Sequence, residues 1–252
     1  MPEGLLTDKI VLVTGASKGI GAATARVCAS FGAAVVLVAR SADAISAVAN
    51  EITNVGGRAL AVPTDVTDAQ AAQEMVEAAI AEFGRLDGAF NNAGIGHMPT
   101  PVADLDVEGF DLAMSTVRGV FLSMKFEVAA MKAAGGGSIV NTSSTAGLQG
   151  VRGMAGYSAA KHGVVGLTKS AAIEYAGDSI RVNAVAPGPI LNERLAALDE
   201  TQLERVSAAV PMGRLGNPEE VGGTVAWLLS DLSSFVTGAV ISVDGGRLAG
   251  QS

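Results

Sequence analysis

The sequence predicts an α/β protein with a parallel, doubly wound sheet covered by helices on both faces. Short apolar runs alternate along the chain with longer segments of helical pattern, an alternation typical of parallel sheets. The 32 glycines fall mainly at the ends of the apolar runs, where they mark turns. No linker-like stretch divides the 252 residues, of which 49% are hydrophobic. We therefore expect one domain over residues 1–252.

The predicted elements follow one another in a regular order. Each strand is a short run of mostly β-branched or small apolar residues, as in KIVLVT and AVVLVA. The expected strands are 9–14, 34–39, 58–63, 86–90, 138–142, 180–186 and 239–243. Two helices are expected to end near residues 31 and 55, and four more are expected to span 69–83, 107–133, 157–176 and 218–229. Residues 190–215 are irregular and partly helical, which predicts a lid over the site.

Composition and charge argue against several classes of function. The net charge is −8, the pI is near 4.8, and the cations form no stripe, so we expect no nucleic acid and no membrane partner. A small molecule is the favoured partner. The single cysteine, Cys28, is expected in the core and suits a reducing compartment. With no signal-like start and no apolar run near 18 residues, we expect a soluble cytoplasmic protein.

A glycine-rich loop joins the first strand to the first helix. It reads Gly15-Ala-Ser17-Lys18-Gly19-Ile20-Gly21. Glycines at such a turn let backbone N–H groups approach a pyrophosphate at the positive end of the helix. The spacing differs from the commoner Gly-x-Gly-x-x-Gly fingerprint, and turn chemistry alone also explains a glycine loop. The strand before it and the helix after it favour a phosphate site.

The end of the second strand predicts which dinucleotide is bound. About 20 residues beyond the glycine loop, an NAD site usually has an acid that binds the ribose hydroxyls. This chain has Ala39 and Arg40 there. No carboxylate repels a 2′-phosphate at that position, while Arg40, and also Lys18, can pair with one. The sequence therefore predicts NADP(H) in preference to NAD(H); the alternative is a solvated arginine that merely ends a strand.

Polar loops are expected at the carboxyl edge of the sheet, where ligands bind in open α/β sheets. They are Thr64-Asp65-Val66, Asn91-Asn92-Ala93-Gly94 and Pro187-Gly188-Pro189. The asparagine amides can join neighbouring strands or touch a cofactor. His97, on a loop at the same edge, is either a pocket residue or simply exposed. We assign no residue to a metal site.

Tyr157 and Lys161 are four residues apart in a predicted helix, so their side chains share one face. A unit charge about 4 Å away, at an effective dielectric near 20, contributes roughly 4 kcal/mol, which is up to about 3 pKa units. We therefore expect the Lys161 ammonium to lower the pKa of the Tyr157 phenol toward neutrality. Such a pair alone is common on surface helices. Ser144, which follows a predicted strand, and the other motifs strengthen it.

Taken in order, these motifs resemble the short-chain dehydrogenase/reductase family along the whole chain. The match is carried by Thr14-Gly-Ala-Ser-Lys-Gly-Ile-Gly21, Asn91-Asn-Ala-Gly94, Ser144, Tyr157-x-x-x-Lys161, Pro187-Gly188 and Asp244-Gly-Gly246. The resemblance implies a seven-stranded Rossmann sheet, a homotetramer, and hydride transfer between a nicotinamide and a carbonyl or secondary alcohol. By the same resemblance, Tyr157 would be the proton donor, Ser144 would hold the carbonyl oxygen, and Lys161 would bind the nicotinamide ribose.

The resemblance also implies cofactor contacts, and two positions depart from it. Asp65 and Val66 would flank the adenine, Asn92 would lie along the cofactor, and Ile190 would contact the nicotinamide. Thr116 stands where the family has an asparagine that supports a water relay. Its hydroxyl and backbone carbonyl predict an altered relay. Asn192 stands where a threonine commonly holds the carboxamide, and asparagine can make a similar hydrogen bond.

The expected substrate is a hydrophobic ketone. Segments expected to line the pocket supply two polar residues, His97 and Gln149, among apolar ones. The apolar residues are Met98, Leu148, Val151, Met154, Leu191, Leu195 and Met212. Several of them can instead fill the core. A mainly apolar pocket suits a free cyclic or aryl ketone better than a sugar.

Two alternatives stay open. The first is a 3-ketoacyl carrier-protein reductase, which docks an acidic partner through basic residues; the corresponding stretches here, 129–135 and 176–178, have few cations. The second is a catalytically silent NADP-binding protein on the same fold. A silent protein has no need to keep Ser144, Tyr157 and Lys161 together.

Overall fold

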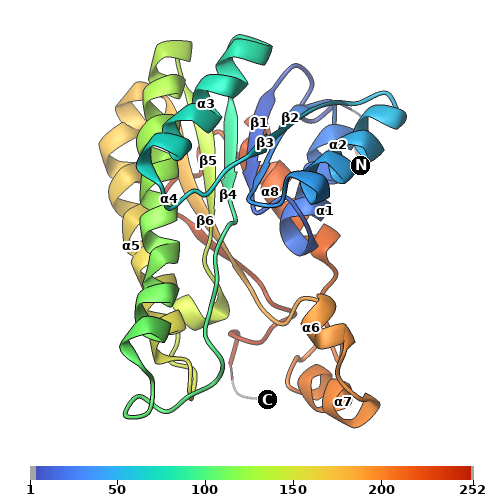
Figure 1. The fold of residues 1–252 in the computed structure, drawn as a ribbon, viewed down its shortest axis with the longest axis vertical. Helices are drawn as coiled ribbons and strands as arrows, with labels where there is room; N and C mark the ends of the chain where they lie inside the picture. Colours follow the sequence, from blue (N-terminus) through green and yellow to red (C-terminus); the bar gives the residue numbers. More distant parts are fainter. Residues whose placement is uncertain (1–3, 251–252) are drawn as a thin grey trace.

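Seven parallel strands form one sheet in the computed structural model, which describes residues 4–250 (Figure 1). Their order is β3-β2-β1-β4-β5-β6-β7, and all neighbouring pairs are parallel. The strands are β1 (Ile10–Thr14), β2 (Ala34–Ala39), β3 (Arg58–Pro63), β4 (Gly88–Asn91), β5 (Gly137–Thr142), β6 (Ile180–Pro187) and β7 (Val240–Val243). The predicted doubly wound sheet and its seven strands are thus confirmed.

Helices cover both faces of the sheet (Figure 1). The α-helices are α1 (Gly19–Ser30), α2 (Ala42–Asn54), α3 (Ala69–Phe83), α4 (Val107–Ala134), α5 (Ala155–Tyr175), α6 (Glu193–Ala196), α7 (Glu200–Ala208) and α8 (Pro218–Leu229). Helices α1, α2 and α8 share one apolar core with the sheet, and α3, α4 and α5 share the other. Among residues 4–250, no helix is both long enough and apolar enough to span a membrane.

The two cores divide the strand residues between them. Val11 and Val13 of β1 belong to the first core, whereas Ile10 and Leu12 belong to the second, because successive side chains of a strand point to opposite faces. Cys28 is buried in the first core as predicted. Burial raises the pKa of its thiol to about 12, so this cysteine has the inert character of a packing residue.

A few predicted boundaries are shifted. The predicted strand 86–90 becomes Gly88–Asn91, and just before it the Asp87 carboxylate accepts the N–H of Ile10 at 2.9 Å. Helix α5 begins at Ala155, slightly before Tyr157. The irregular segment 190–215 contains α6 and α7, and Ile190 pairs with Gly216 in an isolated bridge. Its function as a lid stays a prediction.

The strand order creates a crevice at the carboxyl edge. β2 and β4 lie on opposite sides of β1, so the connections after β1 and β4 diverge, which is the usual place for a ligand in such sheets. Gly15 has a φ of +67°, a conformation that favours glycine. A Cβ on Gly21 would overlap the carbonyl oxygen of Gly15. These two glycines let α1 begin directly against the end of β1.

Candidate active site

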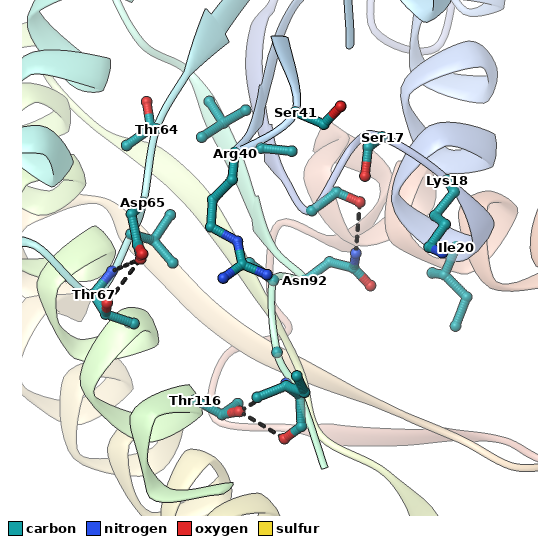
Figure 2. Close-up of a pocket in the computed structure, with 18 of the residues that line it drawn as sticks. Ser17, Lys18, Ile20, Arg40, Ser41, Thr64, Asp65, Thr67, Asn92 and Thr116 are labelled. Atoms are coloured by element: carbon teal, nitrogen blue, oxygen red, sulfur yellow. Dashed lines mark hydrogen bonds between the residues drawn. The ribbon is translucent and has the colours of Figure 1, made fainter. Parts of the chain in front are cut away.

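A cleft of about 710 Å³ lies at this carboxyl edge (Figure 2). Its walls come from the segments that follow β1, β2, β3, β4 and β6, together with one face of α4. Twelve residues predicted to bind the cofactor line it: Gly15, Ser17, Lys18, Ile20, Arg40, Asp65, Val66, Asn92, Ala93, Gly94, Ile190 and Asn192. Thr116 and Leu191, predicted for catalysis and substrate, line it too. These predicted residues thus share one cleft, and their functions stay predictions.

The remaining predicted cofactor residues are not part of the cleft wall: Gly19, Gly21, Tyr157, Lys161, Pro187 and Gly188. Two of them act as packing positions. Gly21 meets Gly15 as described above, and a Cβ on Gly188 would lie 2.8 Å from the Cα of Asp244. The N–H of Gly188 also donates to the Val243 carbonyl at 3.0 Å. These glycines keep neighbouring backbones close enough to shape the cleft.

Arg40 is the cationic side chain at the end of β2, and it extends into the cleft (Figure 2). The carboxylate of nearby Asp65 is held by its own loop: it accepts the Thr67 N–H at 2.9 Å and the Thr67 hydroxyl at 2.7 Å. The backbone hydrogen bond from Thr67, the Thr67 hydroxyl and the charge of Arg40 lower the pKa of Asp65. Asp65 is therefore ionised but already bonded, and Arg40 makes no ion pair within 4.0 Å among the described residues.

Lys18 of the glycine loop contacts the insertion. Its Nζ lies 2.6 Å from Oε2 of Glu193, in the first turn of α6. Both side chains are largely exposed, so this ion pair contributes little to stability. Lys18, predicted as a second partner for a 2′-phosphate, therefore has a carboxylate partner in this structure.

Asn92 fixes the loop after β4 to the glycine loop. Its backbone N–H donates to the Thr14 hydroxyl at 2.9 Å, and its Nδ2 donates to the Thr14 carbonyl at 3.2 Å and to that of Gly15 at 3.4 Å. The amide thus orders the chain where the two strands meet. On the other side, the Thr142 hydroxyl donates to Oδ1 of Asn92 at 3.5 Å.

Ser144, Tyr157 and Lys161 come together behind the loop 94–96. The Ser144 side chain lies close enough to the Tyr157 phenol to lower its pKa, and its Oγ accepts the Ala146 N–H at 3.1 Å. A Cβ on Gly96 would lie 2.9 Å from Cδ2 of Tyr157, and one on Gly94 would lie 3.5 Å from Nζ of Lys161. Since Gly94 lines the cleft, Tyr157 and Lys161 lie against a loop that forms part of the cleft wall.

The predicted effect of Lys161 on the pKa of Tyr157 was wrong for this structure. Burial raises the pKa of Tyr157, and the nearby Ser144 side chain lowers it only in part. Lys161 donates to the Thr142 carbonyl at 2.8 Å, and its Nζ is 5.7 Å from the centroid of the Tyr157 ring. Burial also lowers the pKa of Lys161 to about 8. Four-residue spacing put the two side chains on one face, but did not bring their polar ends together.

Thr116 is buried on α4 and contacts the backbone of the loop 94–96. Its hydroxyl accepts the Ile95 N–H at 3.1 Å and donates to the Ile95 carbonyl at 3.2 Å. A Cβ on Gly94 would lie 2.9 Å from its Cγ2. The hydroxyl therefore holds this loop with both its donor and its acceptor capacity.

Most residues predicted to contact substrate lie outside the cleft. Only Leu191 of that group lines it; the others are His97, Met98, Leu148, Gln149, Val151, Met154 and Leu195. Nε2 of His97 accepts the Tyr157 N–H at 3.3 Å, while its Nδ1 is 2.7 Å from the Met98 carbonyl, so His97 caps the first turn of α5. Met212 lines a second cavity of about 310 Å³ that shares Ile190 with the first. A role in substrate binding stays a prediction for these residues.

Sequence reasoning missed several residues of the cleft. On α4 these are Leu112, Ser115 and Gly119, which surround Thr116 at helical spacing, so the pattern around Thr116 would have found them. Ser41 and Thr67 also line the cleft. Ser41 directly follows Arg40, and Thr67 comes two residues after Asp65. Their closeness in sequence to predicted site residues was the signal that could have identified them. Between residues 4 and 250, no group of three or more His, Cys, Asp or Glu side chains is placed to hold a metal ion.

Comparisons with known proteins cover nearly the whole chain. The family model described as enoyl-(acyl carrier protein) reductase matches residues 15–247. Cyclohexanol dehydrogenase of Acinetobacter sp. (strain SE19) is 45% identical over 94% of each chain. The 3-oxoacyl-[acyl-carrier-protein] reductase of Thermotoga maritima is 40% identical over 96% of this chain and 98% of its own. The crystal structure of levodione reductase superposes with a TM-score of 0.94 at 37% identity, covering 98% of this chain and 100% of that one.

Proposed function

This chain belongs to the short-chain dehydrogenase/reductase family of NAD(P)-dependent oxidoreductases acting on CH–OH and C=O groups, and we propose that it is an NADP(H)-dependent reductase of hydrophobic cyclic or aryl ketones. The observation that supports the proposal most is that Tyr157 and Lys161 both contact the loop 94–96, whose Gly94 lines the cleft, with Ser144 next to the Tyr157 phenol. In the reverse direction the same site would oxidise a secondary alcohol.

The described residues fit a dinucleotide. The Gly15–Gly21 contact leaves a backbone cradle at the start of α1 that a Cβ would fill, and such a cradle suits a pyrophosphate. Arg40 lies in the cleft at the end of β2, beside a residue, Ala39, that has no charge. This arrangement supports NADP(H) over NAD(H). When bound, the nicotinamide supplies or accepts the hydride.

The chain's own residues would handle the proton. Tyr157 would donate its phenolic proton to the carbonyl oxygen, and Ser144 would hold that oxygen through its hydroxyl. Burial keeps the Tyr157 phenol protonated, the form that a reductase needs. Lys161, fixed by the Thr142 carbonyl, would bind the ribose and offer a proton route from the phenol toward Thr116.

Thr116 supplies a test of the loop that it holds. Thr116→Asn is expected to keep or raise kcat without changing cofactor affinity, because an amide can also accept from Ile95 N–H and donate to its carbonyl. Thr116→Val is expected to lower kcat and to cost about 1–3 kcal/mol of stability, because it leaves both Ile95 groups unpaired. Thr116→Ser, which keeps the hydroxyl, is the control. A large loss of kcat in folded Thr116→Asn would give the threonine a role of its own.

The substrate class rests on the apolar character of the residues around the site. Leu112, Ile190 and Leu191 line the cleft beside polar residues. The residues predicted to surround the substrate, such as Met98, Leu148 and Met154, are mainly apolar, which favours a ketone with few hydroxyls. One similar enzyme, cyclohexanol dehydrogenase, is named for a cyclic alcohol. Both points support a free cyclic or aryl ketone.

A 3-ketoacyl carrier-protein reductase is the second candidate, and the similarity to the Thermotoga maritima enzyme favours it. An acidic carrier protein needs a basic docking surface. In the stretch 129–135 the one cation is Lys132, and its Nζ lies 2.8 Å from Oδ2 of Asp178. The charge that a carrier protein would need is therefore already paired with an acid.

The deciding experiment compares kcat/KM for three substrates with NADPH. Cyclic and aryl ketones are expected to give the highest values, an acetoacetyl carrier protein a lower one, and glucose little activity. A clear advantage for either of the last two would overturn the substrate proposal. No turnover on any carbonyl, with NADP⁺ still bound, would favour the silent binding protein. The homotetramer and the cytoplasmic location stay predictions, which gel filtration and cell fractionation would test.

A further inference from the structure

A carboxyl group that the proposed chemistry does not use lies buried between α4 and the sheet. Glu127, in the second half of α4, has no exposed surface. Its Oε2 accepts a hydrogen bond from Nδ2 of Asn91, the last residue of β4, at 2.9 Å. A wholly buried carboxylate without a cation is costly, so its presence requires an explanation.

The hydrogen bonds around Glu127 have one consistent direction. The Thr168 hydroxyl donates to the Val164 carbonyl at 2.8 Å, which can only accept. Thr168 must then accept from Nδ2 of Asn141, at 3.0 Å. Oδ1 of Asn141 in turn accepts from Nδ2 of Asn91 at 3.1 Å. The Val164 carbonyl thus fixes the orientation of the side-chain amides of Asn141 and Asn91. Nδ2 of Asn91 donates one hydrogen bond to Asn141 and one to Glu127.

This network contains more acceptors than donors. Oδ1 of Asn91 and Oε1 of Glu127 are both buried and have no hydrogen-bond partner among the described residues. They belong to the two groups already joined by the Nδ2–Oε2 bond. A proton on Oε1 would let the carboxyl group donate to Oδ1 and would satisfy both atoms at once, as in a cyclic acid–amide pair.

We propose that Glu127 carries a proton in the folded protein at neutral pH, donates it to Oδ1 of Asn91, and through this neutral pair positions the ends of β4 and β5. Asn91 immediately precedes Asn92, which binds the glycine loop. Asn141 immediately precedes Thr142, whose carbonyl anchors Lys161. Glu127 is therefore a positioning residue beneath the cleft. This positioning role rests on the proposed function, whereas the inference that Glu127 is protonated does not depend on it.

The charges around Glu127 agree with a neutral carboxyl group. The strands behind it, β4, β5 and β6, contain one charged residue, Arg181, which donates to the Ser230 and Val236 carbonyls. On α5, Lys161 donates to Thr142. The other ionisable residues on α4 and on the helices packed against it are exposed or half-buried: on α4, Glu108, Asp111, Arg118, Lys125 and Lys132; on α3, Glu74, Glu77 and Glu82; on α5, Tyr157, His162, Lys169, Glu174 and Tyr175.

No charge therefore compensates the cost of ionising Glu127. Burial raises its pKa from 4.5 to about 8, and the Asn91 hydrogen bond lowers it only in part. Because the folded pKa lies above the unfolded one, the contribution of Glu127 to stability is complete below about pH 4.5 and is lost as the pH rises to about 8.

Glu127→Gln tests the proton directly, because glutamine has the same shape, no charge, and an N–H that can donate to Oδ1 of Asn91. Chemical unfolding is measured from pH 5 to 9. Between about pH 5 and 8, the unfolding constant of the wild type is expected to rise about tenfold per pH unit relative to that of Glu127→Gln. Glu82→Gln, which removes an exposed carboxylate from α3, is the control and is expected to follow the wild type. Equal pH dependence in wild type and Glu127→Gln would overturn the proposal.

Infrared spectroscopy gives a second readout that does not depend on unfolding. The difference spectrum of wild type minus Glu127→Gln is expected to show the C=O stretch of a protonated carboxylic acid well below pH 8, and to lose it above about pH 8. A carboxylate band at neutral pH in place of that stretch would refute the proton.

The positioning role of Glu127 is tested by the affinity for NADP⁺. Glu127→Gln is expected to bind NADP⁺ as the wild type does, whereas Glu127→Leu, which leaves one N–H of Nδ2 and the Oδ1 of Asn91 without a partner, is expected to bind it about 2- to 30-fold more weakly. Retained affinity in a folded Glu127→Leu protein would remove the positioning role and leave the proton in place. Calorimetric NADP⁺ binding does not require the correct ketone, so an error in the proposed substrate cannot imitate this result.

Discussion

Tyr157→Phe is expected to lower kcat for ketone reduction by about 10²–10⁴-fold, the usual contribution of a positioned general acid. The substitution removes the transferable proton and keeps the ring, which packs against Gly96. Folding and NADP⁺ affinity are expected to change little. The measurement is steady-state turnover with NADPH and a cyclic ketone, together with calorimetric NADP⁺ binding.

Tyr175→Phe is the matched control, because Tyr175 is the other tyrosine of the chain and lies at the end of α5, away from the cleft. It loses the same hydroxyl group and is expected to keep full turnover. If Tyr157→Phe also kept near-normal turnover, Tyr157 would have no part in the mechanism and the proposed proton donor would be wrong.

Arg40→Ala is expected to weaken NADPH binding by about 10- to 150-fold, the range for a charge-assisted hydrogen bond. NADH, which has no 2′-phosphate, is expected to bind nearly as before. The effect should shrink at high salt, because Arg40 is exposed and exposed charges are screened. The measurement is KM and kcat for both nucleotides at two ionic strengths.

Arg58→Ala is the control for net charge. Arg58 is also exposed, but it begins β3 at the amino end of the sheet, opposite the cleft. It is expected to leave both nucleotides unaffected. A wild-type enzyme with the higher kcat/KM for NADH would show that the Ala39-Arg40 pattern does not select the cofactor.

Local patterns predicted the fold well, and most residues predicted for the cofactor line one cleft. Strands such as 34–39 are continuous apolar runs because helices cover both faces of the sheet. The glycine loop lies directly after β1 because the strand and helix α1 meet there. These features depend on neighbours in the sequence. Arg40, Asp65 and Asn92 were found because the carboxyl ends of parallel strands share one edge.

Features that depend on distant contacts were predicted poorly. The polar end of Lys161 is directed by the Thr142 carbonyl, on β5, and burial outweighs any effect of Lys161 on Tyr157. His97 and Met98 lie on a loop whose path no periodicity describes. Glu127 was overlooked, although Met124 and Met131, at helical spacing on either side of it, are buried with it. That apolar stripe was a usable signal of an inward-facing carboxyl group.

The place of β1 in the sheet affects how the protein can be divided. β1 is completely buried and pairs with β2 on one side and, through Val11–Gly88 to Val13–Phe90, with β4 on the other. A fragment that ended before Gly88 would contain the glycine loop and Arg40, yet β1, which is fully buried in the whole chain, would be an open edge able to pair with other chains. The half that carries the glycine loop is therefore not a transferable module. During synthesis, the nascent chain must reach β4 before its β1 edge is protected from aggregation.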